Sequence, residues 1–168
     1  MTTHPINSLI LELVSTKRLA TVTEIEAISS HVAQAPFASY LSHVPQRIRQ
    51  ALDKKSLTVP AKLPSVEWHV LERVYLDEQW SLGTTPVQYV ADLRQAILHP
   101  QAEIWTYRYY HEPAIAFIAP SHLRNAPKPE RFLFVSYNPN FASLTTGYQT
   151  HGAAFALGMG CQDLRQHR

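Results

Sequence analysis

The side chains best suited to acid–base chemistry are histidine and tyrosine residues in the second half of the chain, where threonine hydroxyls also occur. His99 follows a segment with a helical pattern, Tyr137 ends an apolar stretch, and Thr146 and Tyr148 belong to a run rich in hydroxyl groups. Histidine can gain or lose a proton near neutral pH, and tyrosine can donate one. With a cation such as Arg108, these groups could transfer protons and stabilise an anion without a metal. The candidate catalytic residues are therefore His99, Arg108, Tyr137, Thr146 and Tyr148.

The same residues also have structural explanations. His99 could act as a capping residue at the end of a helix, where an imidazolium interacts favourably with the helix dipole. Threonine is a good strand former, so Thr146 could belong to a half-exposed edge strand. Arg108 stays protonated and cannot serve as an ordinary base, which leaves it only the role of a cation.

Positive side chains in a long loop could hold a polyanion. Residues 120–130 form a basic, proline-rich segment that contains Arg124 and Lys128, and Arg131 opens the next apolar stretch. We expect these cations to gather with Arg108 at one end of the sheet if the loop folds back over it. Such a cluster would bind phosphate groups and make the affinity for RNA depend on salt.

Two further side chains could contact a nucleic acid. Arg94 projects from the apolar face of a predicted helix, where a guanidinium either has a structural partner or reaches a ligand. Tyr107 lies in a predicted strand and could stack on an unpaired base. The candidate RNA-binding residues are therefore Arg94, Tyr107, Arg124, Lys128 and Arg131.

Composition restricts the class of protein. The 168 residues fit one domain, and a formal net charge of +2 permits a phosphate-bearing partner without requiring one. The single cysteine, Cys161, excludes an intramolecular disulfide and a zinc site built from thiolates. No metal-ligand motif and no glycine-rich phosphate loop is present, so we expect neither a metal nor a cofactor. The N-terminal apolar residues are spaced along one face, which predicts no membrane span and a cytoplasmic protein.

The first half of the chain reads as a helical region followed by a linker. Apolar residues recur at helical spacing within 6–14, 25–32 and 37–52, so we expect helices throughout residues 1–53. Thr23 with Glu26 has the spacing of a capping box for the second helix. Residues 54–65 contain two prolines and three lysines without apolar periodicity, and we expect an exposed linker there.

The second half reads as an α+β domain over residues 66–150. Thr85, Pro86 and Gln88 have the types and spacing that begin a helix, which His99-Pro100 should end. Four strands are expected in an antiparallel sheet with helices packed on one face: Glu103–Tyr110, Ala114–Ala119, Arg131–Tyr137 and Ser143–Gln149. Residues 151–168 show no firm pattern and are expected to be a loosely ordered tail.

Three runs within this domain resemble a known superfamily. They are WSLGTTP at residues 80–86, YVADLRQAILHP at 89–100 and SYNPNFASLTTGYQ at 136–149, within about 70 of the 168 residues. Helices followed by a four-stranded antiparallel sheet that ends in Thr-Thr-Gly-Tyr-Gln look like the barnase, EndoU, colicin and RelE superfamily of small ribonuclease domains. The similarity is to its uncharacterised phage- and toxin-associated branch. It implies a site with Thr146 and Tyr148, although Arg108 stands where the family often has lysine or histidine on a strand.

The resemblance implies a metal-independent ribonuclease of toxin type, which cleaves RNA by transesterification. Its expected partners are RNA, such as transfer or messenger RNA, and a neutralising antitoxin or immunity protein, while the N-terminal helices could form a homodimer interface. Two other readings stay open at this point. One is a non-catalytic module that binds protein or RNA on the open face of the sheet, and the other is an enzyme acting on a small phosphate-containing ligand such as a nucleotide.

Overall fold

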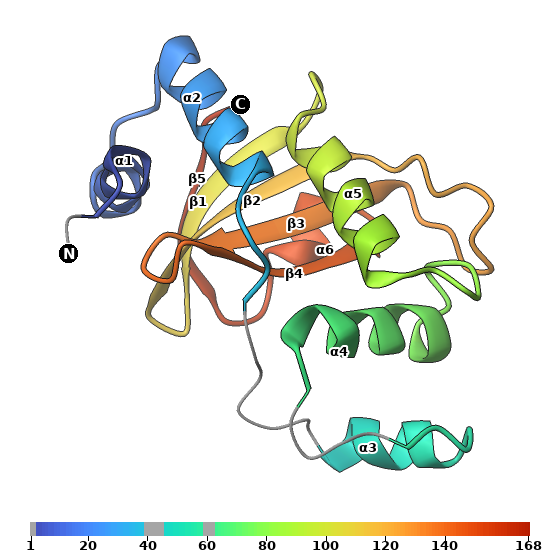
Figure 1. Ribbon diagram of the computed structural model, residues 1–168. Coiled ribbons are helices and arrows are strands. Elements are labelled where there is room, and N and C mark those ends of the chain that lie inside the picture. Colours follow the sequence, from blue (N-terminus) through green and yellow to red (C-terminus); the bar gives the residue numbers. More distant parts are fainter. Residues whose placement is uncertain (1–2, 39–45, 59–62) are drawn as a thin grey trace.

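The protein is described by a computed structural model that covers residues 3–38, 46–58 and 63–168 (Figure 1). A five-stranded sheet with the order β4-β3-β2-β1-β5 lies at its centre, and all neighbouring strands are antiparallel. The strands are β1 (Glu103–Tyr109), β2 (Glu112–Pro120), β3 (Phe132–Asn138), β4 (Ser143–Thr150) and β5 (Cys161–Gln166). The predicted α+β class and antiparallel order are confirmed. The prediction of four strands is wrong, because β5 adds a fifth beside β1.

Helices precede and cover the sheet. Their bounds are α1 (Pro5–Ser15), α2 (Val22–Ala33), α3 (Gln46–Asp53), α4 (Ser65–Leu71), the π-helical turn η1 (Glu72–Leu76), α5 (Pro86–Ile97) and α6 (Ala153–Ala156). Figure 1 shows α1, α2 and α5 over one face of the sheet and α6 on the other. Among the described residues, no helix is long and apolar enough to cross a membrane.

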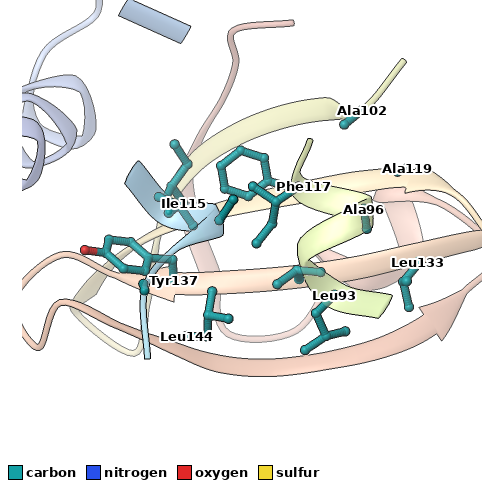
Figure 2. Close-up of a cluster of buried hydrophobic side chains, with 14 of the residues drawn as sticks. Leu93, Ala96, Ala102, Ile115, Phe117, Ala119, Leu133, Tyr137 and Leu144 are labelled. Carbon is teal, nitrogen blue, oxygen red and sulfur yellow. The ribbon is translucent and has the colours of Figure 1, made fainter. Parts of the chain in front are cut away.

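The main core lies between α5 and the sheet (Figure 2). Leu93 on α5, Phe117 on β2 and Leu133 on β3 are each 0% exposed and belong to one buried cluster. Burying a leucine or phenylalanine side chain contributes roughly 1.5–3 kcal/mol. Buried residues of α1 and α2 extend the same cluster, so the apolar stripes of both helices are used in folding. A homodimer through these helices therefore stays a prediction.

The start of α5 follows the expected pattern. Thr85 is the N-cap, and the reciprocal bonds of a capping box join it to Gln88 at 2.9 and 3.2 Å. The buried face of α5 differs from the predicted one, however. It is formed by Tyr89, Leu93, Ala96 and Ile97, while Arg94 lies on the exposed side.

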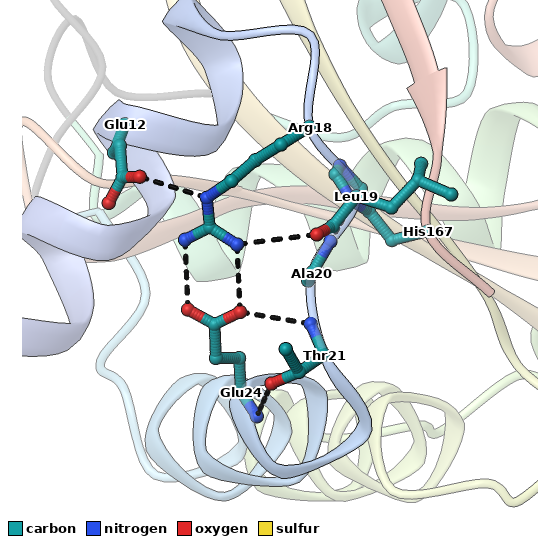
Figure 3. Close-up of polar contacts among 7 residues, drawn as sticks. All are labelled: Glu12, Arg18, Leu19, Ala20, Thr21, Glu24 and His167. Atoms are coloured by element: carbon teal, nitrogen blue, oxygen red, sulfur yellow. Dashed lines mark hydrogen bonds and ion pairs between the residues drawn. The ribbon is translucent and has the colours of Figure 1, made fainter.

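A single arginine ties α1 to α2 (Figure 3). Arg18 bonds Glu12 of α1 at 2.9 Å and both carboxylate oxygens of Glu24 of α2 at 2.9 Å. Hydrogen bonds from Arg18 and from the Thr21 backbone lower the pKa of Glu24 to about 2. The capping box of α2 is therefore made by Thr21 and Glu24, and the prediction of Thr23 with Glu26 is wrong by two residues. Glu24 also forms the bidentate ion pair with Arg18, and the spacing of capping residues along the chain does not reveal this pair.

The C-terminal segment is held by backbone pairing and by one histidine. Beyond β5, the His167 amide donates to the Ile104 carbonyl at 2.8 Å. The His167 side chain accepts from the Ala20 amide through Nδ1 at 3.0 Å and contacts Thr106 Oγ1 through Nε2 at 2.8 Å. The expectation of a loosely ordered tail therefore does not describe residues 153–156 and 161–166. The sequence of β5 is mostly polar and lacks apolar alternation, because this strand is exposed at the margin of the sheet.

The predicted linker and third helix are described in part. Residues 59–62 of the linker and residues 39–45 of the third apolar stripe lie outside the described residues. The linker begins with exposed residues, whereas its later residue Leu63 is buried with Ile48 and Leu52 of α3 and Trp68 of α4. This small cluster packs α3 against α4.

We predict that acidification destabilises the fold through two half-buried histidines. Burial lowers the pKa of His31 and His167 below 6.5, so the unfolded chain takes up protons first as the pH falls through that value. Stability should be full above about pH 6.5 and decline below it. Urea unfolding of the wild type at about pH 7.5 and about pH 5.5 should show this loss, and His31→Asn and His167→Gln should each reduce it. Equal losses in the wild type and in both variants would contradict the assignment.

We also predict that Gly147→Ala destabilises the protein by about 1–3 kcal/mol through overpacking. A Cβ at this position would lie 2.3 Å from Cδ2 of Leu93, well inside van der Waals contact. Gly158→Ala is the matched control, since its Cβ would meet no atom closer than 3.4 Å. In a Leu93→Ala background the effect of Gly147→Ala should largely vanish. Equal effects of Gly147→Ala in both backgrounds, measured by urea unfolding, would exclude the contact as the cause.

Candidate functional site

A cavity opens on the face of the sheet opposite α1, α2 and α5. Its volume is about 590 Å³, within the range of small-ligand sites. We call it the tyrosine cavity. Its lining comes from the β1–β2 hairpin, β3, β4, α6 and the start of β5: Tyr107, Tyr109, Tyr110, Glu112, Pro113, Ala114, Phe134, Ser136, Asn138, Thr145, Thr146, Tyr148, Phe155, Ala156, Met159 and Cys161.

Buried aromatic rings form the inner part of the tyrosine cavity. Tyr107 is 3% exposed, and the ring of Tyr148 lies 4.8 Å from that of Phe134. Burial raises the pKa of Tyr148 to about 12 and also raises the pKa of Tyr107. Both phenols are therefore protonated at neutral pH and can donate hydrogen bonds.

Hydroxyl groups of β3 and β4 lie side by side in the same cavity. The hydroxyls of Ser136 and Thr145 are 2.5 Å apart. The register of β3 with β4 shifts here, because Ser136 pairs with Thr146 while Tyr137 pairs with Leu144. Thr145 is thus an extra residue, and this bulge lets two consecutive threonines reach one cavity. The result is a short polar row of donors and acceptors.

An arginine that the sequence pattern did not single out supports this row. Arg73 on η1 donates to Thr146 Oγ1 at 3.2 Å and to the Gly147 carbonyl at 3.0 Å, and its guanidinium lies 5.1 Å from the centre of the Tyr148 ring. Glu72 and Asp77 hold the same group at 2.6 and 2.7 Å. Arg73 is therefore a fixed, neutralised cation behind the cavity wall. The only local signal for it is the i,i+4 spacing from Asp77.

The rim of the cavity exposes large apolar side chains. Tyr109, Tyr110, Phe155 and Met159 are 50%, 63%, 70% and 89% exposed. Tyr109 and Tyr110 meet edge to face, with ring centres 4.7 Å apart. Several exposed apolar side chains around a cavity that contains polar groups are typical of a binding site. The sequence analysis placed Tyr110 at the end of the first predicted strand and did not name it as a site residue. In the structure β1 ends at Tyr109, and Tyr110 has a left-handed backbone in the hairpin.

One carboxylate stands at the rim. Glu112 begins β2 and accepts a hydrogen bond from Asn138 Nδ2 at 3.2 Å. It is the only acidic side chain in the described lining. Cys161 lies across the cavity, and burial raises the pKa of its thiol, so this group is protonated at neutral pH.

The structure brings the candidate catalytic residues Thr146 and Tyr148 together with Tyr107, a candidate RNA-binding residue. It separates the remaining candidate catalytic residues from them. Tyr137 points to the helix side, where it is 0% exposed and donates to Asn7 Oδ1 at 2.5 Å (Figure 2). His99 follows α5, and its Nδ1 accepts from the Gln101 amide at 3.0 Å, near the start of β1 and far from the hairpin.

The candidate cations do not form one cluster. Arg108 lies at the hairpin end of the sheet and contacts Ser15 at 3.3 Å and Asp163 at 3.6 Å. Arg124, Lys128 and Arg131 belong to the β2–β3 loop at the opposite end of β2. Lys128 is paired with Glu78 at 2.7 Å, and Arg131 lies over the ring of Phe132. Arg94 is exposed on α5.

The tyrosine cavity combines stacking surfaces, hydroxyl groups and one carboxylate. Within the described part of the chain, no group of three His, Cys, Asp or Glu side chains is placed to hold a metal ion. The cavity could hold a flat, uncharged ring between aromatic side chains and offer hydrogen bonds to its edge.

Comparisons with protein-family models, curated proteins and solved structures find no match to the chain, so the fold and the geometry of the cavity carry the functional argument.

Proposed function

We propose that this protein binds single-stranded RNA without cleaving it, and that it takes an unpaired base into the tyrosine cavity. The observation that carries the proposal is the grouping of four tyrosines, Tyr107, Tyr109, Tyr110 and Tyr148, around one cavity on the open face of the sheet. Stacking of a base on an aromatic side chain contributes roughly 1–3 kcal/mol and tolerates any sequence.

The polar row gives the bound base its orientation. Ser136, Thr145 and Thr146 present hydroxyl groups that can donate or accept, as the edges of bases require. A base held in duplex keeps its edge paired and its faces stacked on its neighbours. Single strands and loops should therefore bind better than duplex RNA.

The charges indicate that stacking contributes more to affinity than phosphate contacts. No lysine or arginine belongs to the described lining of the cavity, and Arg73 behind it is neutralised by two carboxylates. Arg108 is the cation at the hairpin end, and Arg124, Lys128 and Arg131 could contact the backbone of a longer strand. For each such contact, a plot of the logarithm of the binding constant against the logarithm of the salt concentration would gain a slope of about −0.7.

We predict that Tyr109→Ala and Tyr110→Ala each weaken binding of a fluorescent oligoribonucleotide by about 5- to 150-fold, the equivalent of one lost stacking contact. Both side chains are about half exposed or more, so their removal should leave the fold intact. Val87→Ala is the control, because Val87 is 80% exposed on α5, on the other side of the sheet. Fluorescence anisotropy measures the affinity. Wild-type affinity in both tyrosine variants, or no binding by the wild type, would refute the proposal.

A second candidate function is the metal-independent ribonuclease of toxin type that the family resemblance implies. Glu112 favours it, because this carboxylate shares the cavity with the protonated phenol of Tyr148. Glu112 would accept the proton of the RNA 2′-hydroxyl as that oxygen attacks phosphorus, and Tyr148 would donate a proton to the leaving 5′-oxygen. The Thr146 hydroxyl, which accepts from Arg73, would donate to the phosphate oxygen on which negative charge develops. An antitoxin or immunity protein would then cover the rim.

This second candidate predicts cleavage of an oligoribonucleotide in the presence of a metal chelator. Glu112→Gln and Tyr148→Phe should each lower the rate by about 10²- to 10⁴-fold, the usual contribution of a general acid or base. Glu67→Gln, at an exposed position of α4, is the control. The products are separated by gel electrophoresis. Binding without cleavage would leave the non-catalytic function, and cleavage that survives both substitutions would place the chemistry elsewhere.

A further inference from the structure

A second cavity lies at the other end of the sheet, where the β2–β3 loop meets the start of α5. Its volume is about 450 Å³, and it shares no residue with the tyrosine cavity. We call it the histidine cavity. Its lining is Trp80, Ser81, Leu82, Gly83, Thr84, Gln88, Asp92, His122, Leu123, Asn125 and Ala126.

Three side chains in this wall form a continuous hydrogen-bonded chain. The indole of Trp80, which is 2% exposed, donates to Asp92 Oδ2 at 3.0 Å. The other oxygen of Asp92 contacts His122 Nε2 at 2.8 Å. The carboxylate is thus held on both sides, and it in turn fixes the plane of the imidazole.

This arrangement decides which nitrogen of His122 is available. A carboxylate only accepts hydrogen bonds, so Nε2 carries the proton in the neutral imidazole. Nδ1 then keeps its lone pair, and it has no hydrogen-bond partner among the described residues. The side chain is 34% exposed, so Nδ1 can be reached from the cavity or from solvent. A base oriented by a carboxylate is the arrangement that activates water or a hydroxyl group.

Apart from Asp92 and His122 the lining is uncharged, and its polar side chains lie among the apolar Leu82, Leu123 and Ala126. Oε1 of Gln88 is used in the capping box of α5, which leaves its amide NH₂ without a partner in the described chain. Ser81 and Asn125 add further donors, whereas the Thr84 hydroxyl donates to the Ser81 carbonyl at 2.7 Å. No lysine or arginine belongs to the described lining. Neutral donors suit the oxyanion of an acyl intermediate better than the multiply charged transition state of a phosphate ester.

We propose that His122 and Asp92 form a general-base pair that hydrolyses an uncharged carboxylic ester bound in the histidine cavity. His122 is the catalytic residue, and Asp92 and Trp80 are positioning residues. The inference stands on a different cavity from the proposed RNA-binding function and does not depend on it.

The reaction needs only water and the ester. As the water oxygen forms a bond with the carbonyl carbon, one of its protons passes to Nδ1 of His122. When the tetrahedral intermediate collapses, the bond between that carbon and the alcohol oxygen breaks. The proton on Nδ1 moves to the departing oxygen, so the products are an alcohol and a carboxylic acid and the imidazole is regenerated.

Hydrolysis of p-nitrophenyl acetate by the full chain tests the proposal. We expect His122→Ala to lower the rate by about 100-fold or more, and added imidazole to restore part of it. His151→Ala is the matched control, since His151 also pairs with a carboxylate, Glu130 at 3.0 Å, but is 67% exposed. Equal rates in the wild type and His122→Ala, or an equal loss in His151→Ala, would overturn the proposal.

The positioning role of Asp92 has its own readout. Asp92→Asn should lower the rate while the fold, followed by circular dichroism, is kept. Nitrogen-15 NMR of His122 should show the Nε2–H tautomer in the wild type and a mixture of tautomers in Asp92→Asn. An unchanged rate in Asp92→Asn, with a changed tautomer of His122, would overturn the catalytic role of the pair. The same tautomer of His122 in Asp92→Asn as in the wild type would overturn the positioning role of Asp92.

Discussion

Gly147 on β4 contacts both α5 and η1, and these contacts connect the helical layer to the sheet. Leu93 of α5 occupies the space in which a Gly147 side chain would stand. The Gly147 carbonyl accepts from the Tyr89 hydroxyl at 2.6 Å and from Arg73 Nε at 3.0 Å. A buried hydrogen bond contributes about 0.5–1.5 kcal/mol, and one from a charged donor about 1.5–3 kcal/mol. The neighbours Thr146 and Tyr148 are thereby placed in the tyrosine cavity, so one backbone position couples helix packing to the site.

Strand alternation gives the sheet one face that packs against the main helices and another that carries the tyrosine cavity. On β3, Leu133, Val135 and Tyr137 belong to the core under α5, while Phe134 belongs to the cluster under α6 and Ser136 lines the cavity. The helix side is sealed by three helices, whereas α6 is a single short turn that covers part of the other face (Figure 1). The cavity exists because that short helix leaves the hairpin end of the face open.

The sequence predicted those helices and strands that are determined by neighbouring residues in the chain. The capping residues Thr85 and Gln88 and the four alternating strands follow from turn and side-chain spacing alone. β5 could not be read in this way, because backbone pairing with β1 and the contacts of His167 hold an exposed polar segment. Arg94 was predicted on the apolar face of its helix, but the buried face of α5 is centred on Leu93 and Ala96, which leaves Arg94 on the exposed side.

The site was predicted only where strand alternation determined it. Tyr107 on β1 and Thr146 and Tyr148 on β4 line the cavity together, although β2 and β3 lie between their strands. Tyr137 instead follows the alternation of β3 to the helix side. The contribution of Arg73 depends on contacts across more than 70 positions of sequence, from η1 to β4. The spacing of residues along the chain does not predict such a contact.

Ion pairs between the cations and carboxylates of this protein affect how strongly it would attract a polyanion. Arg18, Arg73, Arg108 and Lys128 each have a carboxylate within 4 Å, so much of the positive charge is already compensated within the fold. The exposed pairs among these add little stability, and all four pairs reduce the field that would attract a distant phosphate. Arg124 and Arg131, at the far end of β2 from the tyrosine cavity, are exposed and have no carboxylate within that distance among the described residues. In the proposed binding of RNA, aromatic stacking at the hairpin end would therefore contribute more to affinity than electrostatic attraction would.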